Sequence, residues 1–377
     1  MLKQAKFFII RSLILVSLLF TSIIQAPATP DLTVTLSEPL TVRWRYESSV
    51  TLNLTPAFDT ERIYLPLAGG VIIALQAKDG QLFWRSEIGG ELSASPVADE
   101  NAIYVASEIL DPAGQGKPSG ALRAVGREGG VTQWLTPLVK PLRGAISLSG
   151  GKLFAGGSDG RLYAFDKMTG GVFWSIPFSS PFSGEPVANN GRVYFGCEDG
   201  TLLALEESTG KLLWRYRTKG AIRGPVAVAN DTVFFGSNDG YVYAVKTDNG
   251  RLDWRKRTGG GVEAVVRTGD SLLVASLDNF AYLLNLKGKM NWKRLLPGRI
   301  SAQPLAVQEA ALFTPLSSST AIVLALRDGK QVNTLPTGEE MTGSAAPIVV
   351  GDAVFVTTEH GIVAFARPLN TSTKASN

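Results

Sequence analysis

Residues 156–174 read GGSDGRLYAFDKMTGGVFW, and nearly the same segment recurs along most of the chain. It returns forty residues later as FGCEDGTLLALEESTGKLLW and again as FGSNDGYVYAVKTDNGRLDW. The seven tryptophans follow this series at intervals of 38 to 50 residues: Trp44, Trp84, Trp134, Trp174, Trp214, Trp254 and Trp292. A fixed period of this length is typical of repeat architectures, and it outweighs other local signals.

Each repeat contains two short apolar runs joined by a tight turn. In one copy the runs cover residues 192–196 and 201–205, and the turn between them contains Asp199-Gly200. Because Asp-Gly accepts the positive φ angles of a type I′ turn, we predict a type I′ β-hairpin here. A second turn leads into a short strand ending in tryptophan, and a link containing glycine or proline leads to one more apolar strand. Each repeat therefore supplies four strands.

The strands are apolar at consecutive positions, which indicates sheets covered on both faces by neighbouring sheets. Four-strand units of this length, stacked in a ring, make an all-β propeller of four-stranded antiparallel blades. The first tryptophan strand, residues 40–46, has no hairpin before it, and the last repeat, residues 346–366, has no tryptophan strand after it. We therefore predict that the N-terminal strand closes the last of eight blades. The hairpins are expected near residues 62–75, 102–125, 152–165, 192–205, 232–245, 271–285, 311–326 and 353–366.

The N-terminal residues resemble an export signal. Basic residues precede an apolar run at residues 13–24, which is shorter than the roughly 20 residues of a spanning helix, and Ala26-Pro27-Ala28 follows it. We predict a signal peptide at 1–28, a lead-in at 29–39, the propeller at 40–367 and a disordered tail at 368–377. The expected location is periplasmic or secreted, with the membrane reached only through an uncleaved N-terminal segment.

Charge gives little reason to expect a nucleic-acid partner. The formal net charge is +4, and residues 1–28 contain Lys3, Lys6 and Arg11 without an acidic residue, so removing them leaves +1. Binding of nucleic acid needs a basic face. The basic residues that do cluster follow two of the tryptophans, where they fit either a solvated sheet edge or an anion or partner patch: Arg215, Arg217, Lys219, Arg255, Lys256 and Arg257.

One repeat is longer than the others. Residues 107–120, SEILDPAGQGKPSG, replace the short turn of the second blade and explain the 50-residue interval. Long loops on a regular scaffold often carry function, although a tolerated insertion is the alternative. We name Glu108, Asp111 and Lys117 as the candidate interaction residues of this loop.

The spacing around the tryptophans resembles the docking motif of the pyrroloquinoline-quinone-type repeat family. Ala164, Gly170 and Trp174 illustrate it, and the same spacing recurs at Trp84, Trp214 and Trp254. The resemblance implies that each indole packs between the alanine of its own blade and the glycine of the next, and all seven tryptophans are assigned this docking role. The copy at Trp292 is shortened and places Tyr282 at the alanine position, and a further copy has Asn333 in place of the ring. These two junctions are expected to be the weakest.

Two classes of protein carry such repeats: large quinoprotein dehydrogenases and shorter scaffolds similar to the B-subunit lipoproteins of the outer-membrane β-barrel assembly machinery. Length favours the scaffolds. The dehydrogenases also use adjacent cysteines, whereas Cys197 is the only cysteine of this chain. A lipoprotein needs a cysteine after its signal peptide, and none stands there, so the chain departs from the scaffold class in its anchoring.

Other motifs for chemistry find simpler explanations. His360 is the only histidine and occupies a hairpin turn, so we expect a turn residue rather than a catalytic base. The string at residues 156–160 matches G-x-S-x-G, but a nucleophile elbow requires a following helix. Asp159, Asp199, Asp239 and Asp278 recur once per blade and suit either turns or, as the alternative, calcium. We predict no catalytic, cofactor-binding or metal-binding residue.

From the sequence we expect an exported, non-enzymatic propeller that serves as a protein-interaction scaffold for an envelope protein, in outer-membrane protein assembly. The alternatives are a small quinoprotein-like dehydrogenase and a ligand-sensing propeller, because propeller ligands are recognised by loops that share no motif.

Overall fold

The described strands are arranged as a ring of blades. The structure is a computed structural model, and it describes residues 34–109, 119–182 and 184–368. All of these residues belong to one compact unit, Leu32–Asn377. The predicted signal peptide, residues 29–33 of the lead-in, the tail from residue 369, and Asp111 and Lys117 lie outside the described residues.

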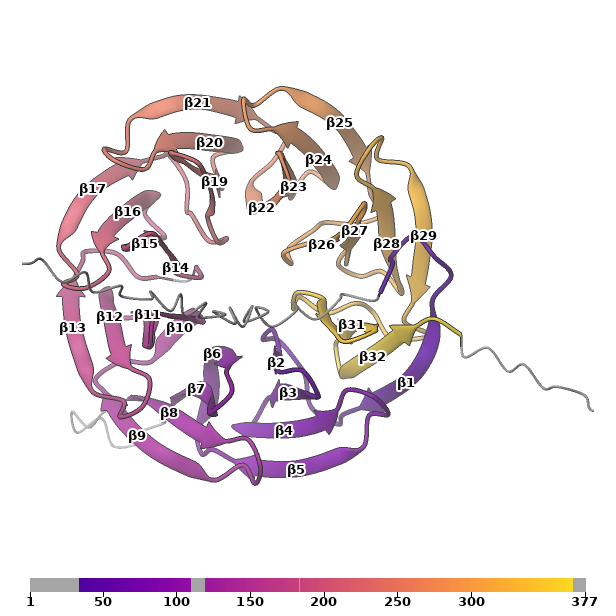
Figure 1. Cartoon of the computed structure of the whole chain (residues 1–377), viewed down its shortest axis with the longest axis horizontal. Helices are drawn as coiled ribbons and strands as arrows, with labels where there is room; N and C mark the ends of the chain where they lie inside the picture. Colours follow the sequence, from indigo (N-terminus) through magenta and orange to yellow (C-terminus); the bar gives the residue numbers. More distant parts are fainter. Residues whose placement is uncertain (1–33, 110–118, 183, 369–377) are drawn as a thin grey trace, which may run out of the picture. The chain divides into compact units, whose positions relative to one another are not determined.

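Within the ring, four strands follow one another from the centre to the perimeter of each blade (Figure 1). The first four blades are β2–β5, β6–β9, β10–β13 and β14–β17. Their bounds are β2 Ala57–Phe58, β3 Arg62–Leu67, β4 Val71–Gln76, β5 Leu82–Glu87, β6 Glu91–Ala98, β7 Ala102–Glu108, β8 Gly120–Gly126, β9 Thr132–Leu138, β10 Leu142–Ser149, β11 Lys152–Gly157, β12 Arg161–Asp166, β13 Val172–Pro177, β14 Val187–Asn189, β15 Arg192–Gly196, β16 Thr201–Glu206 and β17 Leu212–Arg217.

The remaining blades are β18–β21, β22–β25, β26–β29, and β30–β32 with β1. Their bounds are β18 Ala227–Ala229, β19 Thr232–Ser237, β20 Tyr241–Lys246, β21 Leu252–Arg257, β22 Val262–Thr268, β23 Ser271–Ser276, β24 Phe280–Asn285, β25 Met290–Leu295, β26 Leu305–Val307, β27 Ala310–Phe313, β28 Thr320–Ala325, β29 Gln331–Pro336, β30 Ile348–Val350, β31 Ala353–Thr358, β32 Gly361–Ala366 and β1 Thr41–Glu47. The eight predicted hairpins match the second and third strands of these blades to within about one residue at either end.

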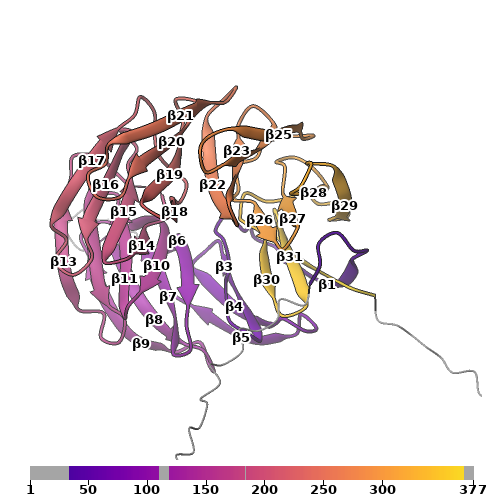
Figure 2. The same cartoon turned by 45° about the horizontal axis from the view of Figure 1, so that its top comes forward.

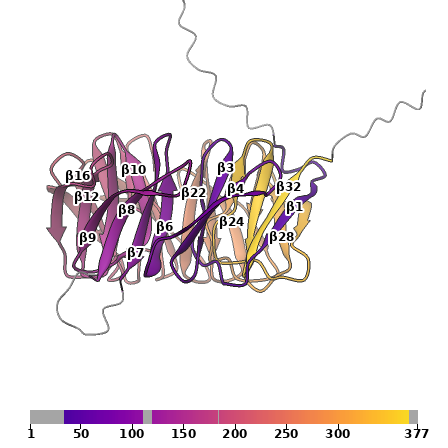
Figure 3. The ribbon, with the colours of Figure 1, turned by 90° about the horizontal axis from the view of Figure 1, so that it is seen from below.

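Six of the sheets have four strands, and a seventh has eight. The eight-stranded sheet arises because the innermost strands β6 and β10 share one parallel pair, Ser95 with Ala145. Counted as four-strand units, the described strands make eight blades, which run side by side between the two faces of the ring (Figure 2, Figure 3).

The last blade is closed by the N-terminal strand, as the sequence predicts. β1 pairs antiparallel with β32, and Trp44 lies opposite Ala364. The two middle strands of this blade are buried along their whole length. Closure therefore joins the two ends of the described chain through backbone hydrogen bonds and a shared core.

Tryptophan indoles connect neighbouring blades. Each Nε1 donates a hydrogen bond of 2.6–3.2 Å to a backbone carbonyl in the next blade, such as Trp44 to Ala77 and Trp174 to Glu207. Each ring also lies on a glycine of that blade, where an added Cβ would approach the ring to within 2.5–2.8 Å. These glycines have φ of 67–76°, so both the left-handed backbone and the lack of a side chain are required: Gly80, Gly130, Gly170, Gly210, Gly250, Gly288 and Gly329.

The register corrects one detail of the docking motif. Six tryptophans lie opposite an alanine of their own blade, but Trp292 lies opposite Leu283 rather than Tyr282. The turn before Trp292 is one residue shorter, so the pairing moves by one position and Tyr282 falls on the other face. There its hydroxyl donates to Asp278, and Trp292 is as buried as the other docked rings, at 6% exposure.

The Asp-Gly turns also differ from the prediction. In the turn at Asp159-Gly160 only the glycine has positive φ, and its N–H donates to the carbonyl of Gly157 at 3.1 Å. The same holds at Gly200 and Gly240. This pattern fits a type I turn followed by a left-handed glycine, not a type I′ turn. The aspartate remains right-handed because its carboxylate accepts a hydrogen bond from the amide two residues on, as Asp159 does from Arg161.

The junction that lacks an indole is filled by the lead-in. In the last blade the fourth strand is the N-terminal β1, so the turn that would receive an indole from β29 does not exist. Asn333 of β29 instead donates from Nδ2 to the carbonyls of Leu36 and Glu38, at 3.1 and 2.7 Å. Val34 and Leu36 are each 1% exposed and pack between the last two blades. The lead-in thus takes the place of the missing turn.

Closure can be tested by truncating the first indole. Trp44→Ala removes a ring that is 9% exposed, together with its bond to the next blade. We expect the free energy of unfolding in urea to fall by about 3–5 kcal/mol. Val42→Ala, on the same strand but 42% exposed, should change it by less than about 0.5 kcal/mol. Equal effects of the two substitutions would contradict closure by β1.

Candidate functional site

The centre of the ring holds a channel to which every blade contributes. A cavity of about 230 Å³ is lined by residues of the innermost strands and of the links that lead into them. An adjoining cavity of about 310 Å³ shares six residues with it. Together they form one central space, and the shared residues are Thr55, Ser95, Ala145, Glu185, Gln303 and Ala346.

The charged side chains that line the channel are Glu185, Arg223 and Glu263, which stand in or next to the links between blades. Arg223 precedes β18 and forms a two-pronged ion pair with Glu198 of the preceding blade, with both N to O distances 3.0 Å. Arg143 of β10 likewise pairs with Glu108 at 2.8 Å. Both arginines occupy the same place in an apolar-Arg-Gly link, and both reach back to the hairpin of the blade before. The links thus carry repeated Arg–Glu bridges between blades.

A third blade extends the bridge at Arg223. The Asn238 amide is assigned with its nitrogen toward Glu263, because the opposite orientation would set acceptor against acceptor. In this orientation Nδ2 donates to Glu263 Oε1 at 2.8 Å, and Oδ1 accepts from Arg223 Nη1 at 3.0 Å. Glu198, Arg223, Asn238 and Glu263 therefore form one network across three blades. We call this network, together with the Arg143–Glu108 pair and Glu185, the channel arc.

Burial and the neighbouring arginine have opposite effects on the pKa of a carboxyl group in the channel arc. Burial raises the pKa of Glu263, the Arg223 guanidinium lowers it, and the nearby Glu198 raises it further. The hydrogen bond to Glu198 raises the pKa of Arg223, so this group stays charged. Burial alone raises the pKa of Glu185, which has no hydrogen-bond or ion-pair partner among the described residues. Glu185 is therefore the carboxyl group of the arc whose charge no neighbouring cation or hydrogen-bond donor among the described residues stabilises.

Among its described residues, the loop predicted from the sequence meets this arc at Glu108. Glu108 ends β7, and its carboxylate pairs with Arg143, so it helps to join two blades. The base of the loop is fixed by Ser119, whose hydroxyl donates to the carbonyl of Val139 at 2.6 Å. Sequence reasoning missed Arg223, Glu263 and Glu185. The signal in the sequence that could have identified them is a charged residue among the small and apolar residues around the links between blades.

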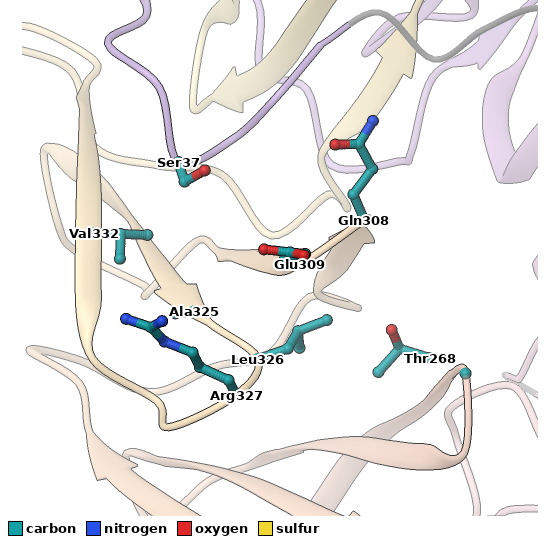
Figure 4. Close-up of a pocket in the computed structure, with 9 residues that line it drawn as sticks. Ser37, Thr268, Gln308, Glu309, Ala325, Leu326, Arg327 and Val332 are labelled. Carbon is teal, nitrogen blue, oxygen red and sulfur yellow. The ribbon is translucent and has the colours of Figure 1, made fainter.

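A second cavity, of about 660 Å³, lies between the sixth and seventh blades and the lead-in (Figure 4). Ser37 of the lead-in and Thr268 at the end of β22 stand on opposite sides of it, with Glu309 and Arg327 between them. Leu326, which also lines this cavity, accepts the indole hydrogen bond of Trp292 through its carbonyl. The cavity therefore borders a docking junction and is separate from the channel arc.

The remaining candidates from the sequence have structural surroundings. His360 lies in the turn between β31 and β32, where its carbonyl accepts from the Ser48 amide at 2.6 Å. Asp239 accepts from Tyr243 at 2.7 Å, and Asp278 from Tyr282. In the part of the chain that the structure describes, no three histidine, cysteine or acidic side chains gather as a metal site. No helix within residues 34–109, 119–182 and 184–368 is long and apolar enough to span a membrane.

Comparison with known proteins places the chain in a family. The family model described as outer membrane protein assembly factor BamB matches residues 33–115, 118–258 and 254–376. The chain belongs to this family. A comparison with curated protein sequences gives no match.

Solved structures support the fold. The crystal structure of BamB from Moraxella catarrhalis aligns with a TM-score of 0.73 and 15% identity, over 88% of this chain and 98% of that one. A computationally designed protein, Ika8, aligns with a TM-score of 0.75 and 15% identity, over 86% of this chain and 99% of that one. Because a designed protein matches as well as a natural one, these likenesses concern the fold alone.

The pKa of Glu185 gives a prediction for stability against pH. Because burial raises this pKa in the folded state, the ionised carboxylate destabilises the fold once the pH exceeds the unfolded value of about 4.3. Glu185→Gln should therefore raise the thermal unfolding midpoint at pH 7.5 and leave it unchanged near pH 4. Glu339→Gln, at an exposed position of the same residue type, serves as the control and should show no such difference. If the unfolding midpoints of Glu185→Gln and the native protein are equal at both pH values, the ionised Glu185 carboxylate does not destabilise the fold.

Proposed function

We propose that this chain is an exported, non-enzymatic scaffold that binds a protein partner during outer-membrane protein assembly. The observation that carries the proposal is the family match over nearly the whole described chain. A signal-like N-terminus supports export, and the periplasm is the proposed location. That the chain is not an enzyme is also a proposal. The geometry of the ring is equally compatible with binding and with catalysis.

The channel arc is the proposed contact surface. It presents an arginine held by an ion pair and two carboxyl groups whose pKa values are raised, and all three line the channel. Glu185 is half-buried and unpaired among the described residues, and a charge partly removed from water is costly unless it is paired. A partner that donates hydrogen bonds to Glu185 and Glu263 would remove this cost. Arginine is also enriched at the centre of protein interfaces.

Affinity capture from a native envelope extract tests the contact surface. We expect Arg223→Gln and Glu263→Gln to reduce recovery of the principal partner by at least about tenfold, as for a central interface residue. Arg85→Gln, at an exposed arginine of β5 away from the channel, should leave recovery unchanged. Thermal unfolding of each variant separates lost binding from lost folding.

The same capture experiment includes the loop of the second blade. Replacing residues 110–118 with Asp-Gly retains Glu108 and its pair with Arg143. If the arc variants recover the full set of proteins while this shortened chain does not, the loop is the contact and the arc is not. If no variant changes the profile, the scaffold proposal fails for both surfaces.

A quinone-binding measurement tests the non-enzymatic part of the proposal. Equilibrium dialysis with pyrroloquinoline quinone and calcium should show no saturable uptake, because we identify no quinone-stacking or cation-ligating set in the channel. Saturable uptake followed by dye-linked alcohol oxidation would favour the alternative, a small quinoprotein-like dehydrogenase. Saturable binding of another small molecule in the channel would favour a ligand-sensing propeller.

A further inference from the structure

The perimeter of the ring is unevenly charged. Strands β17, β21 and β25 are the outermost strands of three consecutive blades and form one continuous stretch of the perimeter (Figure 1). They carry seven basic residues and one acidic residue, Asp253. We call these residues and the lysine that follows β17 the basic rim: Arg215, Arg217, Lys219, Arg255, Lys256, Arg257, Lys293 and Arg294.

The outer strands of the other blades carry few charges, and these are mostly paired or balanced. Strands β9 and β13 contain no charged residue. On β5, Arg85 faces Glu87 at 3.8 Å, and on β1, Arg43 forms an ion pair with Asp352 at 2.6 Å. Arg45 of β1 is exposed and donates to the carbonyl of Thr337, and Glu47 on the same strand offsets its charge. If the basic residues served only to prevent pairing between sheet edges, similar charges would be needed on every outer strand, and acidic residues would serve as well. The restriction of one sign to three adjacent blades therefore calls for another explanation.

Several cations of the basic rim have no anionic partner in the described ranges. Arg215 and Arg257 are exposed, Lys256 is half-buried, and none of the three forms an ion pair there. Arg217 reaches Asp199 at 3.4 Å but keeps 70% of its side chain exposed. Arg255 lies over the ring of Tyr241 at 4.9 Å, which supports the side chain without neutralising its charge. The basic rim thus presents net positive charge to its surroundings.

Exposed apolar side chains lie beside these cations. On the same three strands Leu213 is 42% exposed, Leu252 is 39%, Met290 is 41% and Leu295 is 66%. Leu213 and Leu252 precede the tryptophan of their strand, whereas Leu295 follows Trp292 and Arg294. Exposed apolar side chains therefore lie on both sides of the cations along the perimeter. Long basic side chains beside exposed apolar ones are the combination that binds the interface of an anionic bilayer.

We propose that the basic rim docks on the surface of an anionic phospholipid bilayer. A bilayer fits better than a nucleic acid, because nucleic-acid phosphates offer nothing to the exposed apolar side chains beside the cations. It also fits better than an acidic protein, because flexible, unpaired cations spread over three blades suit a continuous field more than a fixed set of carboxylates. This inference does not rest on the proposed function, since it concerns a surface away from the channel arc.

Sedimentation with lipid vesicles tests the proposal. The chain, isolated from the envelope in whichever N-terminal form it occurs, is mixed with vesicles of phosphatidylglycerol and phosphatidylcholine, and separately with pure phosphatidylcholine. We expect binding to the anionic vesicles at low salt, loss of that binding at about 0.3 M NaCl, and weaker binding to the neutral vesicles. Equal binding to both vesicle types, or none to the anionic ones, would overturn the proposal.

Two triple variants locate the binding surface. Arg215→Gln, Lys256→Gln and Arg257→Gln together should weaken binding by at least about tenfold, since each cation near an anionic surface contributes roughly fivefold. Lys78→Gln, Arg85→Gln and Lys140→Gln remove the same charge from exposed positions outside the basic rim and should weaken it by less than about twofold. Both variants keep the native N-terminus, so their difference measures the rim alone.

Equal loss in the two variants would show a response to net charge and would refute a docking surface. Thermal unfolding midpoints equal to that of the native chain ensure that both variants are folded. If the native chain does not bind the vesicles but binds polyglutamate, and the rim variant loses that binding, the rim binds an acidic polypeptide and the bilayer proposal is wrong.

Discussion

The ring depends on one contact, which is repeated from blade to blade: an indole laid on a left-handed glycine of the next blade. The contact combines burial of a large aromatic surface with a hydrogen bond from Nε1, so the polar atom of the ring is satisfied inside the junction. It also requires two features of the next blade in register, namely a glycine with positive φ and a free carbonyl. Six of the seven rings also lie opposite an alanine, but Trp292 docks opposite Leu283. These features recur about every 40 residues because each blade must both offer an indole and receive one.

Closing the ring with the two ends of the chain removes one receiving turn, and the sequence accommodates this loss locally. Blade eight contains β32 and β1 side by side, so no turn connects them. An indole on β29 would find no glycine there. Asn333 supplies a shorter side chain whose amide still donates to backbone carbonyls, and Leu36 fills the apolar volume. The absent tryptophan and the buried lead-in are therefore two consequences of the same closure.

The sequence predicts the blades well because their signals are local and repeated. Hairpin positions follow from apolar runs around Asp-Gly, and closure follows from the unmatched strands at the two ends. Details that depend on backbone geometry were harder to predict: the turn at Gly160 needs only one left-handed residue, and a turn shortened by one residue places Leu283 opposite Trp292. The channel arc escaped prediction because its members come from different blades. Arg223, Glu198 and Glu263 meet only because the ring brings a link, a hairpin turn and an inner strand of three blades to the same point.

A fold that a designed protein matches as closely as a natural one cannot by itself specify a partner. Specific recognition must come from positions that the indole contacts leave free to vary. Two such sets exist in this chain: the links that enter the channel, and the outer strands on either side of each tryptophan. In the links, charge is placed where it is costly, as at Glu185, whereas on the outer strands it lies in solvent and is restricted to three adjacent blades. Neither distribution is part of the repeated indole contact, and this is the physical reason to look for function in the channel and along the basic rim.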